Sequence, residues 1–126
     1  EQHLQHGPQV PTVNSAMHLY PINGAAHRVG RNDTAWSFRE ANFAQVIVGV
    51  SPDPADNPRI IKWSKDYWAA LHPYASGGAY VNMIMEEGQE RVQAAYRDNY
   101  GRLAAVKARY DPHNLFHVNQ NIQPAR

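Results

Sequence analysis

Tyr80 and Asn82 are the two residues whose types and spacing best suit a chemical role in this sequence. They occur in the segment from Ala79 to Met85, whose composition is typical of a β-strand. Residues two apart on a strand project to the same face, so a phenol hydroxyl and a side-chain amide could form a hydrogen-bonded pair in a pocket. The commoner meaning of the pattern is a tyrosine packed at a strand edge and an asparagine at a turn.

A run of three amide side chains, Asn119, Gln120 and Asn121, lies near the end of the chain. Each amide carries both hydrogen-bond donors and an acceptor. Such a run could therefore present a row of hydrogen-bonding groups to a planar heterocycle. By itself, a run of this kind more often indicates a hydrogen-bonded loop.

The histidines do not form a convincing metal site. His113 and His117 are four residues apart, which would place them on one face of a helix, but they follow Asp111-Pro112, where helix is disfavoured. A zinc site needs three or four ligands, and no third ligand is evident. The sequence has no cysteine, which excludes disulfides and thiolate ligands, so we expect no metal.

Composition excludes several classes of function. The chain has 126 residues, of which 43% are hydrophobic, and a net charge of +1. Its scattered cations give no electrostatic footprint for nucleic acid, and no run of 18 apolar residues predicts a membrane span. We therefore expect no nucleic-acid or membrane partner. Because the chain opens with Glu1 rather than methionine, we expect a processed or excised segment.

Periodicity predicts an α+β fold, with a mainly antiparallel sheet, two helices packed on one face, and an extended polar C-terminal tail. Residues 1–13 show no periodicity and are interpreted as a linker or disordered arm. The predicted strands are two pieces within residues 15–29, a short one at 35–39, the clearest one at 43–50, and one at 79–85. The predicted helices begin at Asp56 or Asn57 and end near His72, and run from about Gly88 to Arg109.

The segment from Tyr110 to Pro124 resembles the closing motif of berberine-bridge-type flavin oxidases, in which Tyr-Asp-Pro, Asn-Leu-Phe and Asn-Gln-Asn-Ile recur in this order. Upstream, Tyr80-Val81-Asn82 is similar to the Tyr-x-Asn segment of that family. Asn99-Tyr100-Gly101-Arg102-Leu103 resembles its helix motif, and Thr34-Ala35-Trp36 with Arg39 is similar to a further segment. The resemblance covers residues 14–124 and is most specific in the last fifty.

The resemblance implies an architecture with two domains. One domain binds FAD, and the other supplies an antiparallel sheet over the flavin ring. Residues 14–109 would then be part of the substrate-side domain, and residues 110–126 a tail that returns to the flavin domain. No Arg-x-Gly-Gly-His-type attachment motif and no cysteine are present, so we do not expect this chain to bind FAD covalently. The implied partners are an FAD-binding domain or chain and a small-molecule substrate.

The resemblance also implies roles for single residues. Tyr80 corresponds to a catalytic tyrosine beside flavin and substrate, whereas Asn82, Asn119, Gln120 and Asn121 correspond to cofactor-binding positions. The implied reaction oxidises an alcohol, sugar or secondary-metabolite C–H with hydride transfer to flavin, and the chain alone would be inactive. The alternative is a free-standing berberine-like domain that lacks catalysis and acts as a binding or interaction module.

Overall fold

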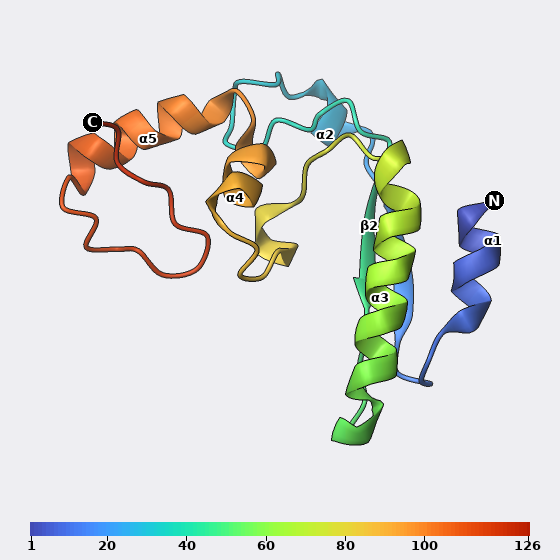
Figure 1. Cartoon of the computed structure of the whole chain (residues 1–126). Helices are drawn as coiled ribbons and strands as arrows, with labels where there is room; N and C mark the ends of the chain where they lie inside the picture. Colours follow the sequence, from blue (N-terminus) through green and yellow to red (C-terminus); the bar gives the residue numbers. More distant parts are fainter. The chain divides into compact units, whose positions relative to one another are not determined.

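The computed structural model describes residues 1–126 and divides the chain into two compact units (Figure 1). We call Glu1–Pro21 with Phe43–Ala75 the strand unit, and Ile22–Asn42 with Ser76–Arg126 the tail unit. No helix in either unit is long and apolar enough to cross a membrane.

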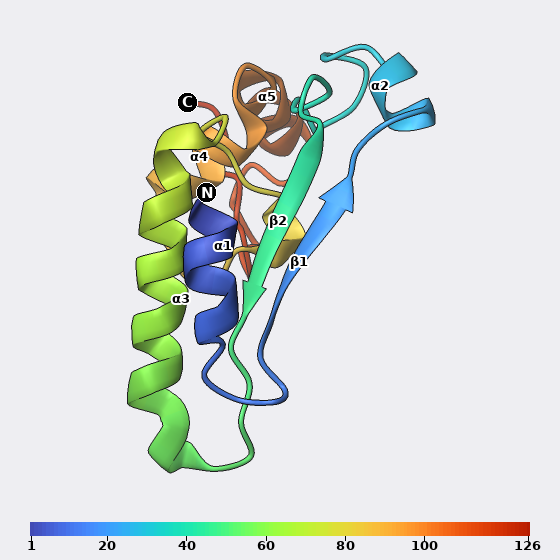
Figure 2. The same ribbon diagram turned by 90° about the vertical axis from the view of Figure 1, so that its right-hand side faces the viewer.

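The strand unit contains the sheet of the molecule. Strands β1 (Ala16–Pro21) and β2 (Phe43–Val48) pair antiparallel, with Ala16 opposite Val48 and Pro21 opposite Phe43. Figure 2 shows this pair of strands beside helices α1 (Gln2–His6) and α3 (Asn57–Leu71). The antiparallel α+β character is confirmed, whereas packing of a second helix on the face of the sheet stays a prediction.

Helix α3 forms as its apolar periodicity predicted. Asp53 accepts a hydrogen bond from the backbone N–H of Ala55 just before the helix, and Pro58 occupies a first-turn position where its missing N–H costs nothing. Ile60, Trp63 and Tyr67 are all buried, and Tyr67 is fully enclosed. Spacings of three and four residues place these side chains on one face, which forms the core of the strand unit.

The expectation of a linker or disordered arm at residues 1–13 is wrong for its first part, because α1 packs against α3. His3 Nδ1 lies 2.8 Å from the hydroxyl oxygen of Tyr67, and the His6 ring stacks on the Tyr67 ring with centroids 5.3 Å apart. Trp63 Nε1 donates to the carbonyl of His6 at 3.1 Å. The histidines therefore supply both the aromatic surface and the polar partners that the buried rings of α3 need.

The tail unit consists of short helices joined by long loops. Its helices are α2 (Ala25–Arg28), α4 (Gln89–Tyr96) and α5 (Asn99–Tyr110), and residues 111–126 form neither helix nor strand. A small apolar cluster is buried between them. It is formed by Ile84, Val92 and Ala95, against which Ala79, Val81, Tyr96 and Tyr100 pack.

The predicted strand from Ala79 to Met85 is wrong. Its centre forms a one-turn 3₁₀ helix, Val81–Met83, closed by a hydrogen bond from the N–H of Met83 to the carbonyl of Tyr80 at 2.8 Å. The sheet has only two strands, both in the strand unit. Without a neighbouring strand, backbone groups of this segment bond within the turn and to the side chain of Gln120, which donates to the carbonyls of Ile84 and Met85.

The predicted single helix from Gly88 to Arg109 divides at Arg97, where φ is +49°. The Arg97 side chain makes three interactions: an ion pair with Glu40, a 2.9 Å hydrogen bond to the carbonyl of Ser76, and a contact over the Phe38 ring, 3.8 Å from its centroid. The hydrogen bond from Arg97 lowers the pKa of the Glu40 carboxyl. Gly101 lies inside α5, so the division does not occur at this glycine.

The predicted strands outside β1 and β2 are also wrong. The short strand expected at residues 35–39 is a loop that buries Ser37 and Phe38. The Phe38 ring lies so close to Gly78 that a Cβ there would stand 1.5 Å from the ring atom Cζ. Within residues 15–29 the first strand ends at Pro21 as expected, but the second piece is helix α2. In each case a tertiary contact or a local turn outweighs β-propensity.

Candidate functional site

The structure brings Tyr80 and Asn82 together as a hydrogen-bonded pair. The side-chain nitrogen of Asn82 donates to the hydroxyl oxygen of Tyr80 at 2.9 Å. The pair lies on the 3₁₀ turn rather than on a strand, and 46% of Tyr80 is exposed. Because the Tyr80 oxygen accepts from Asn82, its own hydrogen remains available to donate to another group. This leaves a positioned phenol at the surface of the tail unit.

The tail begins with a closed loop around Asp111. The Asp111 carboxylate accepts hydrogen bonds from the N–H groups of Leu115 at 2.7 Å and Phe116 at 3.0 Å, and it pairs with Lys107. Lys107 also donates to the carbonyl of Phe116. The hydrogen bond from Lys107, followed by those from the two backbone N–H groups, lowers the pKa of Asp111 to about 2. This network explains physically why Tyr-Asp-Pro and Asn-Leu-Phe occur together.

Beyond this loop the tail turns back along the tail unit, which Figure 1 shows below α5. Gln120 Nε2 donates to the carbonyls of Ile84 at 2.8 Å and Met85 at 3.0 Å. Gln89 Nε2 donates to the carbonyl of Asn121 at 3.0 Å. The amide run therefore lies beside the segment that carries the Tyr80–Asn82 pair.

The five residues singled out from the sequence differ in what they offer to a ligand. Asn82 and Asn119 are exposed, whereas Gln120 and Asn121 are half-buried. No hydrogen bond joins Asn119 or Asn121 to the Tyr80–Asn82 pair, whereas Gln120 forms hydrogen bonds with the segment that follows it. Asn119 has a φ of +58°, a left-handed conformation that asparagine tolerates better than most residues.

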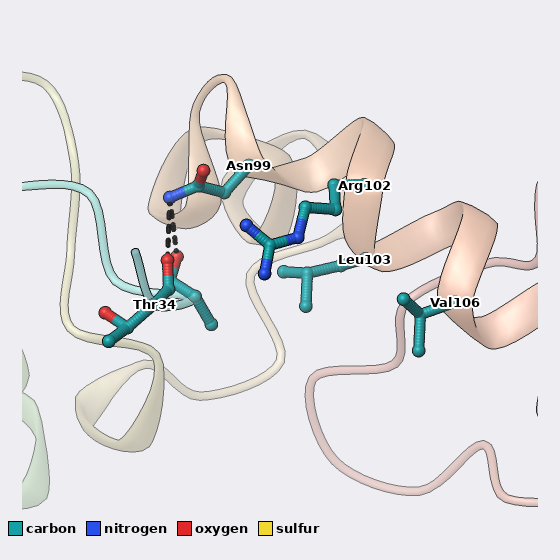
Figure 3. A pocket seen from close by; sticks show the side chains of 6 residues that line it. Thr34, Asn99, Arg102, Leu103 and Val106 are labelled. Atoms are coloured by element: carbon teal, nitrogen blue, oxygen red, sulfur yellow. Dashed lines mark hydrogen bonds between the residues drawn. The ribbon is translucent and has the colours of Figure 1, made fainter. Parts of the chain in front are cut away.

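Asn99 is a buried anchor whose role was not predicted from the sequence. It is 5% exposed, and its side-chain nitrogen donates to the carbonyls of Arg31, Thr34 and Ala35 at 3.0, 3.0 and 3.2 Å. Figure 3 shows Asn99 reaching towards the loop that carries Thr34. Two segments that share the family resemblance, at residues 34–39 and 99–103, are thereby joined. No pattern in the sequence gives this contact, because the three acceptors are backbone groups.

Neither of two cavities lies at the Tyr80–Asn82 pair. The first, of about 90 Å³, is lined by Thr34 and Ala35 together with the residues of α5 seen in Figure 3. The second is an open groove of about 470 Å³ in the strand unit, between the N-terminal residues and α3. Pockets that enclose drug-sized ligands have volumes of about 300–1,000 Å³, so the first cavity is too small for a flavin ring.

The exposed groups around Tyr80 nevertheless suit one side of a planar heterocycle. Tyr80 offers an aromatic face and a hydroxyl, Met83 is 59% exposed, and Asn82 offers an exposed amide. Apolar surface can contact the face of such a ring, and amides can hydrogen-bond its edge. These residues fit contact with a flavin from one side, without enclosing it.

Comparison with known proteins identifies the region that contains this site. Residues 79–123 match the family described as berberine and berberine-like. These residues are a berberine-like region. The resemblance found in the sequence is thereby confirmed, and the region includes the Tyr80–Asn82 pair, helices α4 and α5, and the amide run.

Proteins similar to this chain include FAD-linked oxidoreductases. An uncharacterized FAD-linked oxidoreductase of Bacillus subtilis, YgaK, is 31% identical over 123 residues, which are 98% of this chain and 26% of the relative. An FAD-linked oxidoreductase of Dictyostelium discoideum is 28% identical over 115 residues, 90% of this chain and 25% of the relative. The chain thus spans about a quarter of the length of these curated relatives.

A solved structure supports the fold. The chain superposes on a chitooligosaccharide oxidase with a TM-score of 0.63 at 23% identity, covering 91% of this chain and 27% of that protein. At this identity the likeness shows the fold alone. The curated relatives quoted above are named as FAD-linked oxidoreductases, and this chain is similar to one part of them.

Proposed function

We propose that this chain supplies the substrate side of an FAD-dependent oxidoreductase that oxidises an alcohol, a sugar or a secondary-metabolite C–H. Bound FAD would supply the acceptor for the hydride that leaves the substrate. The observation that carries the proposal is the Tyr80–Asn82 pair, which lies within the berberine-like region. Its partners would be an FAD-binding domain or chain and a small-molecule substrate.

In this proposal Tyr80 is the catalytic residue, which takes the proton of the substrate hydroxyl as the neighbouring C–H loses hydride. Proton transfer by a positioned side chain typically contributes about 10²–10⁴-fold to a rate. Asn82 holds the phenol in one rotamer through its 2.9 Å hydrogen bond, and it could contact the flavin as well. An isolated phenol is a weak base at neutral pH, so a cation or a second tyrosine would have to assist Tyr80.

The amide run would contact the flavin. Asn119 is exposed, and Asn121 is half-buried with its carbonyl fixed by Gln89. Gln120 was grouped with these residues from the resemblance. Residues 14–109 would belong to the substrate-side domain and residues 110–126 would return to the flavin domain. The exposed apolar side chains of the tail support this arrangement, since Leu115, Phe116 and Val118 are each more than 70% exposed and such surface usually indicates a partner.

The test uses the full-length gene product that contains this chain, purified with FAD. Reduction of the flavin by substrate is followed by its visible absorbance in a stopped-flow instrument. Chitooligosaccharides are the first substrates to try, because one relative is a chitooligosaccharide oxidase. Tyr80→Phe is expected to slow flavin reduction by about 10²–10⁴-fold and to leave FAD bound. Tyr74→Phe, which alters a tyrosine of the strand unit that is 77% exposed, is the matched control.

Two results would count against the proposal. If Tyr80→Phe reduces its flavin at the rate of the control, Tyr80 is not the catalytic base. If the folded full-length product neither binds FAD nor acquires it from an added FAD-binding domain, the alternative of a non-catalytic binding module replaces the proposal.

A further inference from the structure

Gln120 differs from its neighbours in the amide run, because its donor nitrogen is already occupied by the protein. Gln120 Nε2 donates to two carbonyls at once, those of Ile84 at 2.8 Å and Met85 at 3.0 Å. A side-chain amide nitrogen has two hydrogens, so both are used. The nitrogen of Gln120 is therefore not available to a ligand, whereas the side chains of Asn119 and Asn121 form no hydrogen bond with the protein.

The two carbonyls that Gln120 contacts belong to the segment that supports the Tyr80–Asn82 pair. Ile84 is the first residue after the 3₁₀ turn Val81–Met83, and it is buried in the apolar cluster of the tail unit. The turn itself is closed by the hydrogen bond from Met83 to the Tyr80 carbonyl. The segment between Tyr80 and Ile84 is short and has its own hydrogen bond. A side chain that is bonded to Ile84 therefore keeps a fixed position relative to Tyr80.

Other contacts hold the rest of the tail but do not replace this one. Asp111 closes the loop up to Phe116, and Gln89 fixes the carbonyl of Asn121 from the start of α4. Between these anchors, the two hydrogen bonds from the Gln120 side chain join the tail to the segment after Tyr80. We therefore propose that Gln120 is a positioning residue, which sets where Asn119 and Asn121 lie relative to Tyr80 and Asn82 without contacting the cofactor itself.

This inference rests on the proposed function for the site, but the hydrogen bonds from Gln120 to the carbonyls of Ile84 and Met85 can be tested without any flavin. Gln120→Glu keeps the shape of the side chain and makes its donor depend on pH. A protonated carboxyl can still donate one hydrogen bond, whereas an ionised carboxylate would face two carbonyl oxygens and be repelled by them. Free glutamic acid side chains ionise near pH 4.3, and two facing carbonyls favour the protonated form.

The measurement is the set of backbone amide resonances of residues 117–122 in the ¹⁵N-labelled chain, recorded from acid to neutral pH. In Gln120→Glu we expect these resonances to match the wild type at low pH and to move away as the introduced carboxyl ionises. Gln120→Ala should show the moved positions at every pH. Gln123→Glu, on an exposed position of the same tail whose side chain forms no hydrogen bond, is the matched control and should track the wild type. The other ionisable groups nearby, which include Glu86, Glu87, Asp111 and His117, are the same in all four proteins.

The full-length protein then separates positioning from cofactor contact. With FAD bound at neutral pH, Gln120→Glu should slow flavin reduction by about 10–100-fold, since a displacement of about 1 Å at a site can cost about 10² in rate, and activity should recover towards low pH relative to Gln123→Glu. An absence of pH-dependent tail movement, an unchanged rate, or loss of FAD at every pH would each overturn the inference. If the proposed function were wrong, Tyr80→Phe would reduce its flavin at the wild-type rate. The pH-dependent movement of the amide resonances in the flavin-free Gln120→Glu chain would still be observed.

Discussion

The strand unit is centred on two buried aromatic rings of one helix, whereas the tail unit buries hydrogen-bonded polar side chains alongside a small apolar cluster. In the strand unit Tyr67 is fully buried and Trp63 is 7% exposed, and both belong to one long helix. In the tail unit Ser37 is fully buried and Asn99 is only 5% exposed. The Asn99 side chain contacts three backbone carbonyls of a loop that is more than 60 residues away in sequence.

The difference matters because the two kinds of contact obey different rules. Apolar burial is non-directional and roughly proportional to the area removed from water, so an aromatic core tolerates small shifts. A buried amide must keep its partners at set distances and angles, because an unsatisfied buried group costs about 1–3 kcal/mol. The tail unit thus holds loops, including the segment with Tyr80 and Asn82, in defined positions with little regular secondary structure.

Truncation of the strand-unit core should have the largest effect on stability. Trp63→Ala removes the ring that packs edge-on against Tyr67, with centroids 5.7 Å apart, and its hydrogen bond to the carbonyl of His6. We expect a loss of about 3–5 kcal/mol in the free energy of unfolding, measured by urea denaturation with far-UV circular dichroism. Trp68→Ala, at a site that is 47% exposed on the same helix, should cost clearly less. Equal losses would mean that the aromatic face does not form the core.

Removal of the tail-unit anchor should have the second largest effect. Asn99→Leu keeps a similar volume but leaves the carbonyls of Arg31, Thr34 and Ala35 without their donor. We expect a loss of about 1–3 kcal/mol in the same denaturation experiment, with faster amide exchange in residues 31–35. Asn42→Leu, an exposed asparagine in the same unit, is the control. A variant as stable as the control would show that apolar contacts, and not Asn99, hold this unit together.

The same difference explains how much of the fold the sequence could predict. Helix α3 and strand β2 could be predicted because period and burial agree over many residues, as Ile60, Trp63 and Tyr67 show. The division of the second helix at Arg97 could not, because it depends on Glu40 and Phe38, which are distant in sequence. Helix α1 was missed for a similar reason, since its polar residues acquire their role only against Tyr67.

The candidate site was predicted in part. From the pattern alone, a hydrogen-bonded pair of Tyr80 and Asn82 on a strand was a possibility and not the commoner meaning. The two side chains do form a hydrogen bond, but on a 3₁₀ turn. The proximity of the amide run to this turn followed only from family resemblance, because no local pattern links residues 119–121 to residues 84–85. The Asp111 loop lay within the motif that was identified, yet its hydrogen bonds depend on Lys107, which local composition does not reveal.

The hydroxyl of Tyr67 tests how firmly α1 is held within the strand unit. Tyr67→Phe keeps the buried ring but removes the partner of His3 Nδ1, which lies 2.8 Å away. We expect a loss of about 1 kcal/mol, measured by urea denaturation, and faster amide exchange confined to residues 2–6. Tyr74→Phe alters a hydroxyl on a residue that is 77% exposed and should change neither quantity. If both variants behave alike, ring stacking rather than this hydrogen bond holds α1.

The Asp111 loop should respond to pH with the smallest effect on overall stability, because the contacts involved are local to the tail. The pKa of Asp111 is lowered from 3.8 to about 2 in the folded chain, chiefly by the hydrogen bond from Lys107. A carboxyl whose pKa is lower in the folded state stabilises that state above its unfolded pKa, and this contribution is lost as pH falls through the folded pKa. We therefore expect the N–H groups of Leu115 and Phe116 to lose protection from exchange between about pH 4 and pH 2.

Asp111→Asn should lack this pH-dependent step and show weaker protection at neutral pH, because a neutral amide cannot form the ion pair with Lys107. If the wild-type loop kept its protection at pH 2, Pro112 and Asn114 would be sufficient to fix the turn. The Asp111 carboxylate would then contribute little to the position of the amide run that follows.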